Sequence, residues 1–213
     1  VNWDDSLFWN VFYIKGGFLD ADKAFEVLNG IKTYEMRMLQ KTINTTLLAY
    51  VLDSHPDINV SCPILKENSN HELLRDNMYL GLPAPLFTID MEGRDNRPPI
   101  NPIVFKRFLD ALEPAIGMQV SLGQTNSLAL CPAMTTHSEL TDSALREAGI
   151  APTTIRISVG LEDPRLFLAH FIGASRLALD STHAGFSRLF PSAEEIDKRY
   201  ASIHSDISQR HIE

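Results

Sequence analysis

The sequence has few cysteines and no long apolar run. Only Cys62 and Cys131 occur among 213 residues, and neither stands in a C-x-x-C motif. This usage argues against a disulfide framework or a zinc site, and it predicts two buried thiols in a reducing cytosol. No stretch of about 18 apolar residues is present, so we expect no transmembrane helix. The amino terminus also lacks the basic-then-apolar pattern of a signal peptide.

Clusters of basic residues are absent as well. The formal net charge is −8, and the lysines and arginines are too scattered to form a stripe along a phosphate backbone. We therefore expect no nucleic-acid partner. With 44% hydrophobic and 22% charged residues, the composition is that of an average globular protein, which argues against a disordered chain or a fibre. We expect a cytoplasmic protein without a metal site.

The chain has no initiating methionine. It begins Val1-Asn2-Trp3-Asp4, as a sequence from the middle of a protein does. Residues 1–19 are rich in aromatic and aliphatic side chains without a clean period, and such a segment needs a surface to cover it. We therefore predict a piece of a longer protein, in which these residues pack against a missing part or elsewhere in the chain.

Helical and extended patterns alternate along the rest of the chain. Residues 20–29 and 33–52 are expected helices, the first ending at a glycine and the second before a His-Pro pair. In the longer helix apolar positions recur every three or four residues, and Lys41 and Asn44 are expected largely on other faces. Shorter strands and helices are predicted at 58–62, 68–79, 86–90, 103–112, 118–122, 155–161, 165–179 and 194–203, with loops at 81–85 and 93–102.

This order of elements predicts an α/β or α+β sandwich, in which helices cover one face of a sheet. The texture of the sequence changes after Pro56, where the long helix has ended. We therefore predict a domain boundary there, with one part at residues 1–55 and a second domain at residues 56–213.

One arginine occupies a position that is costly for a charged side chain. Arg156 lies in an expected strand between two isoleucines. A guanidinium in such a place needs an anion, and its planar fork suits a carboxylate held by two hydrogen bonds. The anion could be a ligand, or it could be Glu162, Asp163 or an acid elsewhere in the chain. The strand pattern by itself favours the internal salt bridge.

Several short motifs occur in a fixed order around this arginine. The motifs are Gly-Ile-Lys-Thr-Tyr-Glu-Met-Arg-Met at 30–38, His-Pro at 55–56, Ser-Leu-Gly at 121–123, Asn-Ser-Leu at 126–128, Pro-Ala-Met-Thr-Thr-His at 132–137 and Arg-Ile-Ser-Val-Gly-Leu-Glu-Asp at 156–163. Together they resemble the carboxyl-terminal half of the Cys/Met metabolism family of pyridoxal-phosphate enzymes, over about residues 16–175, and the branch of the O-acetylhomoserine sulfhydrylases most of all.

The resemblance implies roles for particular residues. Arg156 matches the arginine that binds the α-carboxylate of the amino-acid substrate, and Ser121 and Thr136 match residues that line the same pocket. His137 and Arg37 are expected to be structural. The resemblance also implies the end of the large domain of a fold-type-I enzyme with its long interdomain helix, followed by the small carboxyl-terminal domain. It further implies pyridoxal phosphate as cofactor and a homotetramer of paired dimers.

Some positions depart from the family pattern. Gln124 replaces a common glycine, and Asn126 stands where many members have glutamate. Val120 stands where the γ-lyases often carry glutamate, which favours the sulfhydrylase branch. The choice between γ-replacement and elimination, and the identity of the thiol or sulfide nucleophile, stay open.

The lysine that holds the cofactor is missing from the sequence. In the family it follows a Ser-x-Thr motif upstream of the segments found here, and none of the lysines at 15, 23, 32, 41, 66, 106 and 198 does so. We therefore assign no catalytic or cofactor-binding residue. The chain alone is expected to be inactive and to need its amino-terminal half or a companion chain.

Three hypotheses about the function remain. In the first, the chain is the carboxyl-terminal part of an O-acetylhomoserine sulfhydrylase, or of a cystathionine synthase or lyase. In the second, it is an orphan non-catalytic domain that only folds or assembles with a partner chain. In the third, it belongs to another pyridoxal-phosphate class such as the aminotransferases, which share the carboxylate arginine but not the spacing of the Ser-Leu-Gly and Thr-His motifs.

Overall fold

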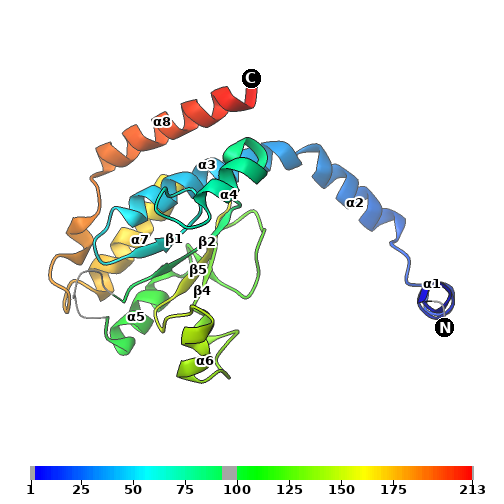
Figure 1. Cartoon of the computed structure of the whole chain (residues 1–213), viewed down its shortest axis with the longest axis horizontal. Helices are drawn as coiled ribbons and strands as arrows, with labels where there is room; N and C mark the ends of the chain where they lie inside the picture. Colours follow the sequence, from blue (N-terminus) through cyan, green and yellow to red (C-terminus); the bar gives the residue numbers. More distant parts are fainter. Residues whose placement is uncertain (1–2, 93–99, 213) are drawn as a thin grey trace. The chain divides into compact units, whose positions relative to one another are not determined.

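The structure is a computed structural model that describes residues 3–92 and 100–212 (Figure 1). The chain divides into two compact units, residues 1–38 and residues 39–213. Of the predicted loop at 93–102, the part from 93 to 99 lies outside the described residues. The division falls within a helix, so most of that helix belongs to the second unit. The boundary near Pro56 concerns the domains of a complete enzyme and stays a prediction.

The first unit consists of short helices whose apolar side chains are largely exposed. Its elements are α1 (Trp3–Leu7), the π-helical η1 (Phe8–Tyr13), α2 (Ala21–Lys32) and the first turn of α3. Asp20 caps α2 by accepting a hydrogen bond from the Lys23 amide at 2.9 Å, which confirms the predicted start. The predicted stop at Gly30 is wrong: the helix continues to Lys32, because Gly30 does not adopt the left-handed conformation of a glycine cap.

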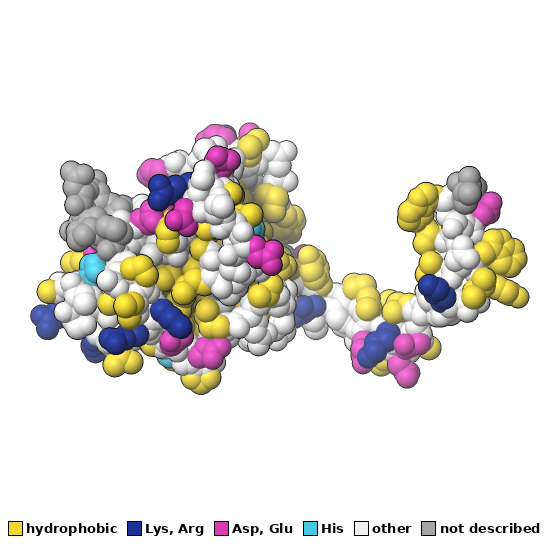
Figure 2. All heavy atoms as spheres, turned by 90° about the horizontal axis from the view of Figure 1, so that it is seen from below, with side chains coloured by type: hydrophobic (Ala, Val, Ile, Leu, Met, Phe, Trp, Pro, Cys, Tyr) yellow, Lys and Arg dark blue, Asp and Glu magenta, His cyan; other side chains and the backbone are white. Residues whose placement is uncertain are grey.

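The described residues of α1, η1 and α2 include no buried side chain. Trp3, for example, is 75% exposed. In Figure 2 apolar side chains cover much of the surface of this part of the chain. No helix among the described residues is both long enough and apolar enough to cross a membrane.

The second unit is built on a five-stranded sheet with the order β1-β2-β5-β4-β3. Its neighbouring strands are antiparallel except for the parallel pair β3 and β4. The strands are β1 (Asn59–Ser61), β2 (Leu86–Asp90), β3 (Gly117–Met118), β4 (Leu128–Leu130) and β5 (Ile155–Ser158). Four of them overlap predicted strands, and β3 is much shorter than its prediction. β4 was not predicted, because three buried apolar residues in a row carry no alternation.

Three helices cover one face of this sheet (Figure 1), as predicted. Their apolar residues share one core with alternate residues of the strands, such as Phe87 and Ile89 of β2 and Ile155 and Ile157 of β5. The three helices are α3 (Tyr34–Asp53), α5 (Pro102–Leu112) and α7 (Pro164–Ala178). Both cysteines are buried in the same core, which confirms the prediction of buried thiols.

Shorter elements complete the unit. The predicted helices at 68–79 and 194–203 correspond to α4 and α8, while α6 was not predicted. Ile207 of α8 packs with Ile43 of α3 in a small second core. The bounds are α4 (His71–Asn77), η2 (Tyr79–Gly81), η3 (Pro132–Met134), α6 (Asp142–Glu147), η4 (Phe186–Leu189) and α8 (Ala193–Ile212).

Candidate functional site

Strand β5 carries Arg156 on the face of the sheet that points away from the three helices. The isoleucines on either side of it are buried against the helices, so strand alternation sends Arg156 to the opposite face. Arg156 pairs with Thr88 of β2 on one side and with Leu130 of β4 on the other. Arg156 therefore lies on the central strand of the sheet, and the residue is half-buried.

The hydrogen bonds of Arg156 leave part of its fork unused. Its Nη2 donates to the main-chain oxygen of Ser121 at 2.7 Å. Its Nε is buried without a hydrogen-bond partner, and within residues 3–92 and 100–212 no acid pairs with the guanidinium. An unpaired buried donor costs free energy that an acceptor from a ligand would recover.

The two acids expected as internal partners of Arg156 are engaged elsewhere. The Oε1 of Glu162 accepts the main-chain N–H of Ser127 at 2.6 Å. Asp163 caps α7 and forms an ion pair with Arg165 at 2.6 Å. The Arg165 guanidinium also lowers the pKa of the Asp163 carboxyl, chiefly through this hydrogen bond. The internal salt bridge that the strand pattern favoured is therefore not formed to either acid.

Ser121 belongs to the segment that joins β3 to β4 and lies over the strand that carries Arg156. Gly123 of this segment has a φ of 81°, in the left-handed region that glycine adopts without strain. Its N–H donates to the Oγ of Ser158 at 3.1 Å. The hydroxyl of Ser121 accepts from the side-chain amide of Gln124 at 3.1 Å. The structure thus brings Ser121 and Arg156 together, through the main chain of the serine.

Gly160, just after β5, contacts the end of the segment that joins β3 to β4. Its N–H donates to the Oγ of Ser127 at 2.9 Å. A Cβ atom at Gly160 would lie 2.1 Å from the Oε2 of Glu162 and 2.5 Å from the main-chain nitrogen of Ser127. Only glycine therefore allows the chain after β5 to approach the entry of β4 this closely.

Two polar residues of α3 also contact this region, and sequence reasoning did not assign them to it. Asn44 donates to the main-chain oxygens of Gly160 at 3.1 Å and of Glu162 at 2.9 Å. Lys41 donates to main-chain oxygens of the 121–124 segment. The apolar spacing puts both residues largely on other faces of the helix than the apolar one, and the structure adds that they too are buried, each at most 2% exposed. Helical periodicity assigns polar residues to solvent unless a buried polar partner is known.

Thr136 lies in an exposed turn after η3. Its Oγ1 is 2.8 Å from the Nδ1 of His137, and the N–H of His137 donates to the main-chain oxygen of Pro132 at 2.9 Å. No hydrogen bond between described residues joins Thr136 to Arg156 or Ser121, so its place in the pocket stays a prediction. Its neighbour His137 makes the loop-holding contacts expected of a structural residue.

Arg37 holds the turn between α2 and α3. Its guanidinium donates to the main-chain oxygen of Gly30 at 2.7 Å and to the Oγ1 of Thr33 at 3.1 Å. These are contacts within the first unit of the chain, in keeping with the structural role expected for this arginine.

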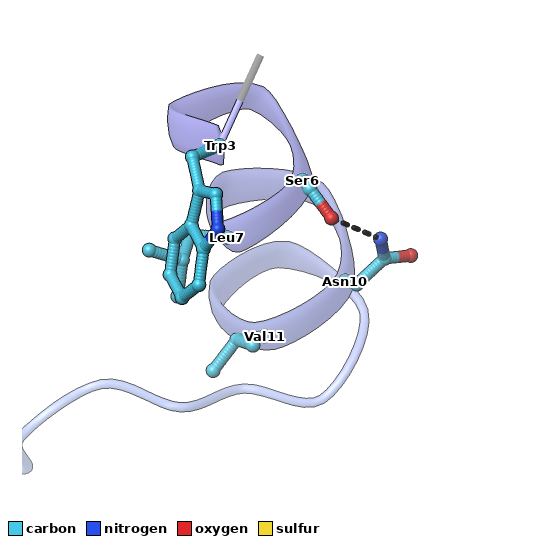
Figure 3. Close-up of a pocket in the computed structure, with 5 residues that line it drawn as sticks. All are labelled: Trp3, Ser6, Leu7, Asn10 and Val11. Atoms are coloured by element: carbon cyan, nitrogen blue, oxygen red, sulfur yellow. Dashed lines mark hydrogen bonds between the residues drawn. The ribbon is translucent and has the colours of Figure 1, made fainter. Parts of the chain in front are cut away.

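Three surface pockets of the described residues are lined by residues other than Arg156, Ser121 and Thr136. The first, of about 330 Å³, is formed by residues of α1 and η1 and is bordered by a hydrogen bond of 3.3 Å between Ser6 and Asn10 (Figure 3). Two further pockets of about 400 and about 550 Å³ lie along α7 and α8 and beside α4. The first is lined by side chains without a carboxylate, an amine or an imidazole, so it offers no acid or base beside the hydroxyl of Ser6.

The described residues do not form a complete pyridoxal-phosphate site. Of the seven lysines, six are exposed and only Lys41 is buried, with its ammonium group bonded to main-chain oxygens. Among the described residues, the lysine bonded to the segment beside Arg156 is Lys41, whose ammonium group is engaged by these carbonyl oxygens.

Comparisons with known proteins place this arrangement in a family. The model of the family described as Cys/Met metabolism PLP-dependent enzyme matches residues 2–171. The O-acetyl-L-homoserine sulfhydrylase of Leptospira meyeri is 31% identical over 149 residues, which are 70% of this chain and 32% of that protein. The L-methionine gamma-lyase of Pseudomonas putida is 32% identical over 149 residues, which are 70% of this chain and 35% of that enzyme.

A solved structure shares the fold. It is a Campylobacter jejuni protein described as an O-acetylhomoserine (thiol)-lyase, whose crystal structure holds a pyridoxyl-lysine group. It is 28% identical to the chain with a TM-score of 0.68, over 81% of this chain and 39% of that one.

The chain belongs to the Cys/Met metabolism family of pyridoxal-phosphate-dependent enzymes. Its mixed α/β fold is part of a fold-type-I enzyme, as predicted. It spans about a third of the length of the curated relatives that it matches.

Proposed function

We propose that this chain supplies the α-carboxylate site of a pyridoxal-phosphate-dependent enzyme of sulfur amino-acid metabolism. The observation that carries the proposal is the state of Arg156. The residue lies at the centre of the sheet, bonds a main-chain oxygen and forms no ion pair within the described residues. A half-buried guanidinium with unused donors is a receptor for a carboxylate, because the two groups match as planar forks.

Arg156 contributes to catalysis by orientation. When pyridoxal phosphate is bound, it supplies the electron sink for chemistry at the α and γ carbons of an amino acid. The arginine fixes the carboxylate, and with it the rotation of the bond between the carboxylate and Cα. Such fixation removes rotational freedom before the reaction begins. Ser121 supports it, because its carbonyl oxygen holds one edge of the guanidinium.

The sulfhydrylase branch is the more specific proposal. The identities to a sulfhydrylase and to a gamma-lyase are nearly equal at 31% and 32%, so overall similarity does not separate the branches. Val120 supports the sulfhydrylase branch, because the resemblance puts a glutamate at this place in many γ-lyases. We therefore propose replacement of the γ-substituent of a homoserine ester by a sulfur nucleophile in the complete enzyme.

In the complete enzyme, we propose that a further surface covers the apolar side chains of the first unit. The apolar side chains of α1, η1 and α2 are exposed in the chain as described. Exposed apolar side chains in this number support a covering partner, which we propose to be the amino-terminal half of the enzyme within a homotetramer of paired dimers. The same exposure supports the alternative of a non-catalytic domain that assembles with a companion chain.

Ligand titration of the 213-residue chain tests the carboxylate site. L-methionine and 3-(methylthio)propylamine differ by the α-carboxylate, so amide shifts seen with the amino acid alone report on its recognition. Loss of a charged hydrogen bond costs about 1.5–3 kcal/mol, so Arg156→Gln is expected to weaken methionine binding by about 10- to 150-fold.

A second arginine supplies the matched control. Arg176 is exposed on α7, and Arg176→Gln removes the same charge without touching the sheet. We expect its affinity for methionine to equal that of the original chain. Equal weakening of methionine binding in both variants would show that the loss comes from the overall charge and not from Arg156. Equal amide shifts with methionine and with the amine would refute the carboxylate site.

A further inference from the structure

A buried ammonium group on α3 holds the segment that carries Ser121. The Nζ of Lys41 donates to the main-chain oxygen of Gly123 at 3.0 Å and to that of Gln124 at 2.6 Å. The side chain is 2% exposed, and it reaches across 82 positions of sequence to make these contacts. The charge therefore sits inside the second unit, against two carbonyl oxygens of one short segment.

Removing an ammonium group from water is costly, and carbonyl oxygens that accept from it offset part of that cost. An apolar side chain could fill the same space on α3 without the desolvation cost. Lysine at this place is therefore explained by the bonds that its charge makes, and two of them end on the main chain of the 121–124 segment.

Three side chains from two elements, β5 and α3, hold this segment. Arg156 of β5 bonds Ser121, and Ser158 of the same strand accepts the N–H of Gly123. Lys41 of α3 bonds the far end of the segment at Gly123 and Gln124. Residues 122 to 126 are themselves exposed, and beyond the segment the main-chain oxygen of Thr125 accepts the N–H of Leu161 at 2.7 Å.

We propose that Lys41 is a positioning residue for the carboxylate site. It fixes the 121–124 segment so that the carbonyl oxygen of Ser121 meets the guanidinium of Arg156 and holds it in one orientation. The inference rests on the proposed function for its consequence in ligand binding, and it acts through Ser121, without contact between Lys41 and the ligand.

Hydrogen exchange of the full chain, followed by NMR, measures the anchoring directly. In Lys41→Met the amide of Gly123 is expected to exchange about tenfold or more faster, because the charged hydrogen bonds that hold its segment are lost. Lys41→Arg keeps a cationic donor and is expected to retain most of the protection. Thr46→Val is the matched control: it removes a buried hydrogen bond within α3, to the main-chain oxygen of Thr42, and leaves the segment untouched.

Binding of L-methionine is the second measurement. Lys41→Met is expected to weaken it about tenfold, with Lys41→Arg and Thr46→Val close to the original chain. Faster exchange at Gly123 with unchanged methionine affinity would overturn the positioning role. Exchange in Lys41→Met equal to that in Thr46→Val would overturn the anchoring itself.

The two measurements also separate this inference from the proposed function. If the original chain does not bind methionine, the proposed function fails. The exchange rates then decide the inference alone: selective acceleration at Gly123 in Lys41→Met sustains the anchoring of the segment, and its absence overturns it.

Discussion

Gly160 offers the sharpest test of how the site is packed. Alanine at this position would place its Cβ 2.1 Å from the Oε2 of Glu162, 2.5 Å from the main-chain carbon of Asn126 and 2.5 Å from the nitrogen of Ser127. The Oε2 of Glu162 is itself buried, and the two main-chain atoms belong to the entry of β4. The Gly160→Ala change must therefore push the end of β5 away from β4.

The cost follows from the contacts that this movement breaks. Overpacking a tight interior costs about 1–3 kcal/mol. Separation would also weaken the hydrogen bond between Gly160 and Ser127 and the charged bond between Ser127 and Glu162. Each such bond contributes about 1 kcal/mol or more, so we expect Gly160→Ala to lower the free energy of unfolding by about 3 kcal/mol. In a chain of this size that corresponds to a melting temperature lower by about 6–12 °C.

Gly173 is the matched control for this substitution. It lies within α7, and a Cβ there would meet nothing within 4 Å. Gly173→Ala is expected to stabilise the chain by about 0.5–1 kcal/mol, because alanine loses less backbone entropy in a helix. Urea unfolding followed by circular dichroism measures both variants. Equal stability of Gly160→Ala and Gly173→Ala would refute the close approach that we describe.

Two further outcomes follow from ionisable groups. The pKa of Asp163 is lowered in the folded chain, so its ion pair with Arg165 stabilises the fold above the unfolded pKa and is lost as pH falls through the folded one. The stability advantage of the original chain over Asp163→Asn, measured by urea midpoints, should thus be present at neutral pH and vanish in acid; an advantage independent of pH would contradict it. Burial raises the pKa of the Cys62 thiol to about 11, so iodoacetamide should label it at least about a hundredfold slower in the folded chain than in urea, and equal rates would show an accessible thiolate.

The outline of the fold could be read from the sequence where a pattern had enough length. The helix α3 spans 20 residues, so its apolar spacing and the following His-Pro pair set its limits. The strand β4 has three residues, all buried, and no pattern of that length separates a strand from other buried segments. The short helix α6 was missed for the same reason of length.

Part of the candidate site could likewise be predicted from the sequence, and part could not. Arg156 could be found from the sequence, because a charge between two isoleucines of a strand needs an explanation. Its contact with the carbonyl oxygen of Ser121 could not, since 35 positions separate the two and no side-chain chemistry marks a main-chain acceptor. The contacts of Lys41 and Asn44 could not be predicted either, because these side chains bond main-chain oxygens. Polar residues that bind the main chain leave no complementary residue type in the sequence.

This use of main-chain acceptors bears on how the site would work. Had Glu162 paired with Arg156, a substrate carboxylate would have to displace another carboxylate of the same charge. Glu162 accepts the N–H of Ser127 instead, and Asp163 is held by Arg165. Carbonyl oxygens orient a guanidinium without neutralising it, because they carry partial charge only. The neighbours of Arg156 therefore fix its direction while its full positive charge remains for the ligand.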